Sequence, residues 1–390
     1  MAVLRQAFDG TRRGAGATAS AARALLDPGT GVAPEVMASV LSDIGPQLLG
    51  YAIGRGWTPA DLGQLTRRRL SPRHVGLLAW LLAEELANHP AETVAPRWLA
   101  ELDALGPPEA VDVTTVAGVT VLLGLCVAIE LVPKLTRVMA PPGAQRQRSG
   151  PAATRDPKDV QRLAKVRALL AKAESTEFAE EAEVLSAKAQ ELISRYALER
   201  LLDDPQTHHG SAPEDGVLVR RIWIDPPYVS AKCLLVQHVA EANRGRAVFS
   251  ADLGFSTVFG VDSDLEPVEL MVTSLLVQAS AAMLHHGSQV SRHGTSQTAS
   301  FRRAFLLSYA QRIGERLREA TEHATEATGR AGELVPVLAD REARVDAARE
   351  HHFPNTTFKG TRVSNAHGWV AGRAAADLAR LDTRPLVEDG

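Results

Sequence analysis

Along most of this chain, apolar residues recur at the three- and four-residue spacing of helices. Residues 15–135 form one such block, which predicts an all-helical N-terminal region. Residues 158–200 carry two further apolar stripes separated by a polar break at 174–177, and they predict a helical hairpin. The stripes consist of Leu163, Val166, Leu170 and Ala173 in the first helix, and of Ala182, Leu185, Ala189, Leu192, Ile193 and Tyr196 in the second.

Within the N-terminal block, the pattern predicts a short helix, a tight break and a longer helix. Thr58 is suited to cap a helix whose first position is Pro59, and that helix ends in Arg67-Arg68-Arg69. Ser71-Pro72 then starts a second helix. This arrangement is typical of a helix-turn-helix DNA-binding unit, but any helical hairpin has it as well.

Beyond residue 214 the period changes. Residues 217–224, 246–250 and 256–261 predict three strands, the last two joined by a hairpin turn at 251–254. Helices are expected between and after them, at 231–242, 266–285, 300–325, 340–352 and 369–381. Gly368 and Gly372 open the last of these helices, and their spacing lets another backbone approach closely.

Residues 141–157 are rich in proline, glycine and arginine, which is the composition of a linker. The expected organisation is an N-terminal helical domain at 1–140, the linker at 141–157, the hairpin at 158–204 and a small domain with C-terminal helices at 214–384. The predicted fold class is helix-dominated α+β with a three-stranded sheet.

Composition narrows the classes of function. The 43 Lys and Arg residues nearly balance 46 Asp and Glu, which excludes a histone-like protein that coats nucleic acid by bulk charge. Two cysteines, Cys126 and Cys233, cannot form a disulfide framework or a cysteine-based zinc site. The uncharged run 113–129 is shorter than a membrane span and predicts a buried helix. We therefore expect a cytoplasmic protein without a membrane partner.

Familiar catalytic and metal-binding patterns are missing from the sequence. No pair of histidines has the spacing of a zinc site, and no glycine-rich phosphate loop occurs. Asp262 and Asp264 follow a predicted strand, where a nuclease could hold magnesium, but turn and capping roles are favoured for them. Neither a metal, a cofactor nor a catalytic residue is assigned.

The strongest polar constellation runs from the segment Ser291-Arg292-His293-Gly294 into the helix start at Ser300, Arg302 and Arg303. Two arginines near a helix N-terminus oppose the helix dipole, and together with free backbone N–H groups they attract an anion such as a phosphate. The alternative is an internal ion pair between one of these arginines and Asp340 or Glu342.

Two further basic clusters complete the set of binding candidates. Arg67, Arg68 and Arg69 could contact backbone phosphates, or they could be solvated cations suited to a helix C-terminus. Arg162 and Arg167 belong to a basic stretch, residues 146–167, that precedes the acidic second half of the hairpin.

The hairpin also carries a recognisable motif. Lys165-Val-Arg-Ala-Leu-Leu-Ala-Lys-Ala-Glu-Ser-Thr is followed by Glu180-Glu-Ala and, six residues after Ala182, by Lys188-Ala-Gln-Glu-Leu. It resembles the bacterial and phage domain-of-unknown-function family 2786, and the region from Phe259 to Ala310 looks like the companion that follows this hairpin. The resemblance implies a bacterial or phage origin and carries no activity.

Three functions follow as hypotheses. The first is a nucleic-acid-associated protein that binds DNA or RNA through its local arginine clusters. The second is a protein-interaction or scaffold role with a protein partner or self-association, and the third is a metal-dependent hydrolase. The sequence favours a non-catalytic role over an enzyme and places nucleic-acid association first.

Overall fold

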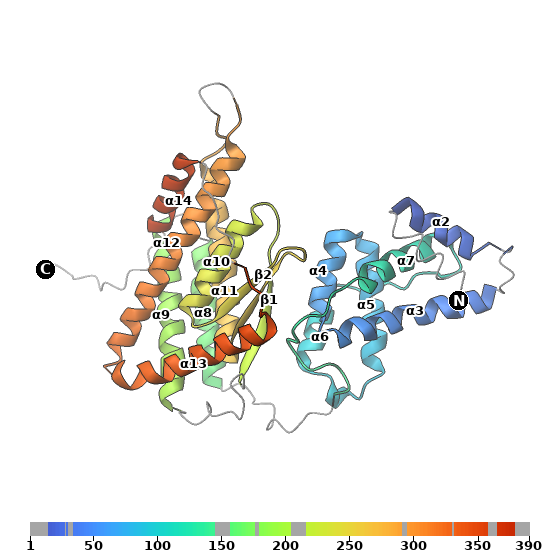
Figure 1. Ribbon diagram of the computed structural model, residues 1–390, viewed down its shortest axis with the longest axis horizontal. Helices are drawn as coiled ribbons and strands as arrows, with labels where there is room; N and C mark the ends of the chain where they lie inside the picture. The colour runs from blue at the N-terminus through green and yellow to red at the C-terminus, as the bar shows by residue number, and fades with distance from the viewer. Residues whose placement is uncertain are drawn as a thin grey trace. The chain divides into compact units, whose positions relative to one another are not determined.

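A computed structural model of the chain divides into two compact units, Met1–Pro151 and Ala152–Gly390 (Figure 1). The division falls inside the predicted linker. The structure describes residues 15–27, 29, 34–144, 157–175, 179–203, 216–290, 295–329, 331–357 and 365–378. Most of the linker, including Arg146, Arg148 and Arg155, lies outside these ranges, as does the predicted polar segment Ser291-Arg292-His293.

Unit 1 is built from helices in the ranges that the structure describes. They are α2 (Ala15–Leu25), α3 (Pro34–Gly54), α4 (Pro59–Arg69), α5 (Pro72–Ala87), the 3-10 helix η2 (Ala91–Thr93), α6 (Pro96–Asp103) and α7 (Val116–Glu130). The predicted break between two helices lies at Leu70-Ser71, between α4 and α5.

Helix α7 is the apolar run that the sequence marks as too short for a membrane span. Its buried side chains include Val119, Leu122, Leu123 and Cys126, and it packs on α2, α3, α4 and α5 as a core helix. In unit 2, α11 is long and apolar enough to cross a membrane, by length and composition alone, and 44% of its most apolar window is buried inside the fold.

The start of α4 is held by reciprocal capping bonds. The backbone N–H of Asp61 donates to Thr58 Oγ1 at 3.3 Å, and the Thr58 N–H donates back to Asp61 Oδ2 at 3.3 Å. Both residues are only 3% exposed, so water cannot readily replace these bonds.

Replacing Thr58 by alanine should therefore lower the free energy of unfolding of unit 1 by about 1–2 kcal/mol, because a capping bond is removed at a buried helix start. Urea unfolding followed by circular dichroism measures this. Thr120→Ala is the matched control, since that hydroxyl donates to the Val116 carbonyl of its own helix, and its replacement should change the value by less than about 0.5 kcal/mol. Equal effects of the two variants would contradict the capping role.

Unit 2 combines a small sheet with a larger set of helices. Its elements are α8 (Pro157–Ser175), α9 (Ala179–Asp203), β1 (Val217–Trp223), α10 (Val229–Ala242), β2 (Arg246–Ser250), β3 (Phe255–Val261), α11 (Asp262–His285), α12 (Thr298–Ala327), α13 (Ala331–His352) and α14 (Ala366–Leu378). This confirms the predicted fold class of helix-dominated α+β with a three-stranded sheet.

The sheet has the strand order β1-β3-β2, and both pairings are antiparallel. Gly254, with a φ of 81°, closes the predicted β2–β3 turn. The central strand is buried on both faces. Val258 points into the core formed with α10 and α11, whereas the Phe259 ring lies 5.8 Å from His352 at the end of α13, which covers the opposite face.

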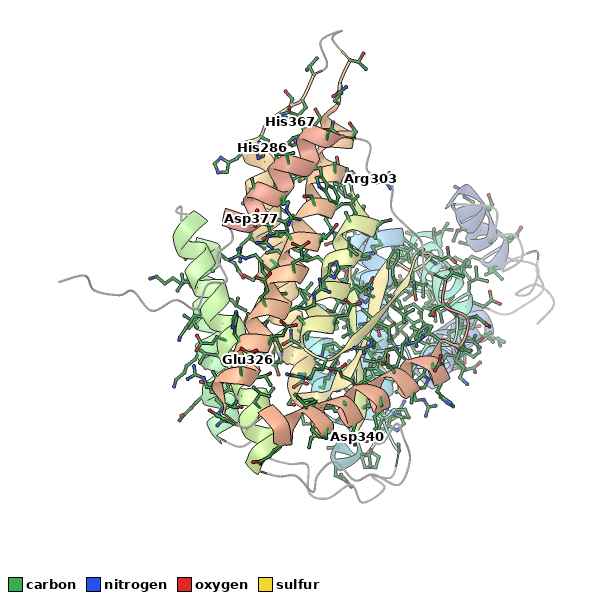
Figure 2. All side chains as sticks on the ribbon, turned by 60° about the vertical axis from the view of Figure 1, so that its left-hand side comes forward. His286, Arg303, Glu326, Asp340, His367 and Asp377 are labelled. Carbon is green, nitrogen blue, oxygen red and sulfur yellow. The ribbon has the colours of Figure 1, made fainter. Side chains whose placement is uncertain are left out.

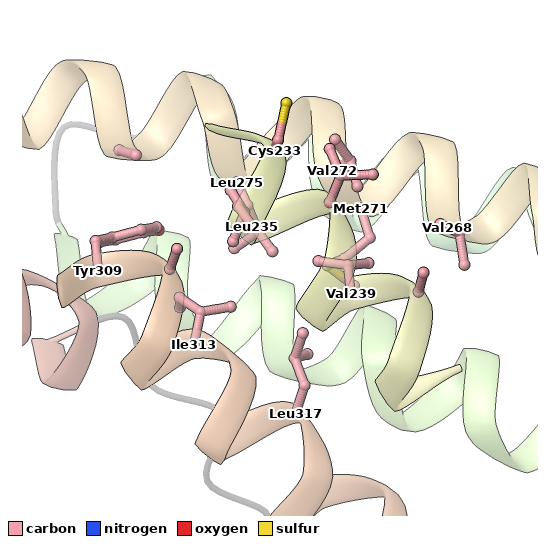
Figure 3. Close-up of a cluster of buried hydrophobic side chains, with 14 of the residues drawn as sticks. Cys233, Leu235, Val239, Val268, Met271, Val272, Leu275, Tyr309, Ile313 and Leu317 are labelled. Atoms are coloured by element: carbon pink, nitrogen blue, oxygen red, sulfur yellow. The ribbon is translucent and has the colours of Figure 1, made fainter. Parts of the chain in front are cut away.

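The hairpin α8–α9 packs into the same core as the sheet and its helices. Val166 and Leu170 of α8 and Ala189 and Ile193 of α9 are buried there, as their spacing predicts. Figure 3 shows the centre of this core, where side chains from α10, α11 and α12 meet. The hairpin is thus part of unit 2 and shares one continuous apolar interior with it.

Three helices of unit 2 start at least three residues earlier than the sequence indicates. α11 begins at Asp262, α13 at Ala331 and α14 at Ala366, against predicted starts at 266, 340 and 369. α11 and α13 contain Pro267 and Pro336 inside the helix. Asp264 and Leu265, which precede Pro267, are buried in the fold, and this packing extends α11 ahead of its proline.

Candidate anion-binding site

Ser300, Arg302 and Arg303 lie in the first two turns of α12. The N-cap residue of this helix, Gln297, makes no side-chain capping bond. Ser300 Oγ donates to the Gln297 carbonyl at 2.9 Å instead of accepting from a backbone N–H. No side chain of the N-cap residue therefore accepts a hydrogen bond from the first turn of α12. The N–H groups of this turn form the positive end of the dipole of a thirty-residue helix.

The N-terminus of α14 lies beside that of α12. Asn365 caps α14 by accepting from the Gly368 N–H at 2.8 Å, and its Nδ2 donates to Ser300 Oγ at 3.3 Å. Residue numbers increase together along the contacts between the two helices: Phe301 meets Gly368, Phe305 meets Gly372, and Arg316 meets Ala376. The two helices are therefore parallel, and their positive dipole ends lie together.

Two histidines flank the same helix starts. His286, at the end of α11, and His367, in α14, each have a ring centroid 5.4 Å from that of Phe301. Figure 2 shows His286, Arg303 and His367 at one end of the helices of unit 2. Both histidines are exposed, so an approaching ligand meets them at this end.

Acidic residues are missing from this part of the chain. Residues 270–314 contain no Asp or Glu, and neither do residues 351–376. These stretches supply most of α11, the first half of α12 and nearly all of α14. This absence is a signal that sequence reasoning missed, because each stretch by itself is only weakly basic and the fold is needed to bring the two together.

Arg302 and Arg303 do not form the internal pairs that the sequence offered as an alternative. Asp340 pairs with Arg344 at 3.1 Å, and Glu342 lies 3.5 Å from Arg246. In the part of the chain that the structure describes, Arg302 Nε is buried without a hydrogen-bond partner, and no ion pair is found for the exposed Arg303.

The arginines of the hairpin are used internally. Arg162 Nη2 lies 2.9 Å from Glu199 Oε2, and its guanidinium stacks over the Tyr196 ring at 4.7 Å. Arg167 pairs with Glu266 of α11. Both charges are thus neutralised within unit 2 and do not extend the basic surface at the start of α12.

The arginines that end α4 have separate surroundings in unit 1. Arg67 donates to the carbonyls of Ala104 and Leu105 at 3.3 and 3.4 Å, and so caps the C-terminus of α6. Arg69 is exposed and Arg68 is half-buried. Arg67 therefore binds carbonyl groups at the C-terminus of a neighbouring helix, where the helix dipole favours a cation.

Catalytic and metal-binding alternatives find little support in the geometry. Among the described residues, no group of three or more His, Cys, Asp or Glu side chains could hold a metal ion. Burial raises the pKa of Cys126 to about 12 and that of Cys233 to about 11, so both thiols are protonated and unreactive at neutral pH. The Asp264 carboxylate is bound by Arg341 at 2.8 Å.

Comparison with known proteins bears on the hairpin. Residues 162–200 match the model of a family described as "Protein of unknown function (DUF2786)". The matched range lies within α8 and α9 and confirms the resemblance seen in the hairpin motif. No curated protein and no solved structure matches this chain. The family description names no activity, so function has to be inferred from the geometry of the site.

Proposed function

We propose that this protein binds nucleic acid, with backbone phosphates seated at the paired N-termini of α12 and α14. The observation that carries the proposal is the meeting of two parallel helix starts with Arg302 and Arg303 in a region without carboxylates. The start of α12 without a side-chain cap, the guanidinium forks and the aligned helix dipoles all favour a phosphate over a neutral ligand.

The surroundings of the other arginines support this location within unit 2. Arg162 and Arg167 have carboxylate partners, so a polyanion gains little by replacing them. Arg302 and Arg303 have no ion-pair partner among the described residues. The expected mode of binding is contact with the phosphate backbone, because helix N–H groups and guanidinium forks bind phosphate oxygens whatever the base sequence is.

The expected result is salt-sensitive binding that depends on these two arginines. In fluorescence anisotropy with labelled single-stranded DNA, duplex DNA and RNA, Arg302→Ala/Arg303→Ala should weaken binding at least about tenfold at low salt. The slope of log affinity against log salt should fall by about 2, because each arginine that is removed no longer neutralises a phosphate.

Arg318→Ala is the matched control. Arg318 lies on the same helix, is exposed, and its Nε donates to the Gly314 carbonyl of its own helix. Its replacement should leave both the affinity and the salt slope nearly unchanged. The proposal fails if no nucleic acid binds at low salt, or if the double variant and the control behave alike.

A further inference from the structure

Two exposed imidazole rings lie against the start of α12, where the proposed phosphate site is (Figure 2). His286 comes from the end of α11 and His367 from the first turn of α14, and both rings contact the fully buried ring of Phe301. The two residues that follow Phe301 are Arg302 and Arg303. Flat aromatic groups from two other helices therefore lie beside the arginines that are proposed to bind phosphate.

Both imidazole rings remain available to a ligand. The His286 and His367 rings are inclined to the Phe301 ring by 59° and 48°, so neither forms a parallel stack with it. Both histidines are exposed, and in the part of the chain that the structure describes, neither ring has a hydrogen-bond or ion-pair partner. An exposed ring that is not stacked within the protein can stack on a nucleic-acid base.

The backbone that carries His286 is tied to the start of α12. The Gln289 side chain donates from Nε2 to the His286 carbonyl at 2.6 Å, and the Gln289 N–H donates to Thr298 Oγ1 at 2.9 Å. Thr298 is the first residue of α12. The turn that follows α11 therefore holds His286 at a fixed place beside the helix start.

The backbone that carries His367 is held as firmly. Asn365 caps the turn that contains His367 by accepting from the Gly368 N–H. Gly368 in turn packs directly on the backbone carbonyl of Phe301, where a β-carbon would have no room. Because the backbone at both rings is already ordered, stacking on a base costs little further conformational entropy.

Such rings favour a single strand over a duplex. In a duplex, each base face is covered by the neighbouring base, so a ring at the protein surface reaches it only after the bases are unstacked. In a single strand, the base faces are accessible while the phosphates can still be bound. A cationic surface beside exposed aromatic rings is the combination by which proteins bind single strands without sequence preference.

We infer that the site at the start of α12 binds single-stranded nucleic acid in preference to a duplex, with His286 and His367 stacked on bases next to the bound phosphate. This inference rests on the proposed function, because the phosphate site places the strand beside the two rings. Stacking tolerates any base, so the preference is for the single-stranded form and not for a sequence.

The test uses the full-length protein and three labelled probes, measured by fluorescence anisotropy at low salt. The probes are an oligothymidylate of about fifteen nucleotides, an abasic strand of equal length and a duplex of equal length. The abasic strand carries the same phosphates without bases. The oligothymidylate should bind at least about tenfold more tightly than the abasic strand, and more tightly than the duplex, because only its bases are free to stack on the two rings.

Two double variants separate stacking from contact with phosphate. His286→Ala/His367→Ala removes both rings and should weaken binding of the oligothymidylate at least about tenfold, with less than about a twofold change for the abasic strand. His286→Phe/His367→Phe keeps a flat ring but removes the imidazole nitrogens, and it should bind the oligothymidylate within about threefold of the unmodified protein. If the imidazoles act on phosphates instead, both double variants lose affinity for all three probes, and the inference is wrong.

His323→Ala is the matched control, because His323 lies on the same helix with its side chain 68% exposed, far from the helix start. Its replacement should leave the affinity for every probe unchanged. Circular dichroism checks that each variant is folded.

Failure of this inference and failure of the proposed function give different results. If the three probes bind equally well and their binding depends on Arg302 and Arg303, the nucleic-acid site stands and the single-strand preference is wrong. If no probe binds, or if Arg302→Ala/Arg303→Ala leaves every affinity unchanged, both proposals are wrong. A preference for the oligothymidylate that the alanine variant loses and the phenylalanine variant keeps supports the inference.

Discussion

Replacing Gly372 by alanine is expected to destabilise unit 2 by about 3 kcal/mol, because the new methyl group has no room between two backbones. An ideal β-carbon at this position would lie 2.1 Å from the Phe305 carbonyl oxygen and 2.8 Å from its Cα. Neither atom belongs to a flexible side chain, so α12 and α14 must separate. The ordinary gain of about 1 kcal/mol on replacing a helical glycine by alanine is outweighed.

Separation of these helices would break several hydrogen bonds at once. Ser308 Oγ donates to the Trp369 carbonyl at 2.6 Å, and Arg316 Nη1 donates to the Ala376 carbonyl at 2.5 Å. Urea unfolding followed by circular dichroism measures the decrease in stability. The same variant should weaken nucleic-acid binding, because the proposed phosphate site needs both helix starts side by side.

Gly332→Ala is the matched control for this change. Gly332 lies at the second position of α13, and an added β-carbon there meets nothing within 4 Å. Its replacement should leave the free energy of unfolding within about 0.5 kcal/mol of its original value. If Gly372→Ala were equally harmless, close packing of the two backbones would not be what holds α14 in place.

Asp264→Asn is the second change with a large expected effect. It should lower the free energy of unfolding by about 3–5 kcal/mol, because it leaves the buried Arg341 and Arg244 charges without their carboxylate. The Arg341 and Asp264 side chains are only 4% and 9% exposed, so water cannot solvate the orphaned guanidinium groups. The measurement is again unfolding by urea.

Glu266→Gln tests the same chemistry two residues away, in an ion pair whose arginine is exposed. Glu266 pairs with Arg167, whose side chain is 55% exposed. Removal of such a pair should cost less than about 1 kcal/mol, because solvent screens the remaining charge. A similar cost for both variants would mean that the Arg341–Asp264 pair is as well solvated as a surface pair.

The sequence predicted most elements of unit 2, because the signals that specify these elements lie within a few neighbouring residues. The strands at 217–224, 246–250 and 256–261 are found as β1, β2 and β3, each within one residue of the predicted bounds. The hairpin 158–204 is found as α8 and α9. Apolar spacing, capping residues and turn glycines act over a few residues, so a single sequence displays them.

The candidate site was predicted only in part. Ser300, Arg302 and Arg303 were identified because an arginine pair at a helix start violates the usual charge pattern. His286 and His367 were not, since nothing in the sequence shows that residues so far apart frame one phenylalanine. The partners of Arg162 and Arg167 were also hidden, because Glu199 and Glu266 lie on other helices.

The sequence by itself determined the helices, the strands, the α+β class and the family likeness of the hairpin. Only the tertiary structure decided which arginines are neutralised, that α14 runs parallel to α12, and that Arg244 is buried beside Arg341 and Asp264. The reason is physical: backbone preferences depend on neighbours in the chain, whereas the energy of a charge depends on burial and on distances of a few ångströms to groups elsewhere in the chain.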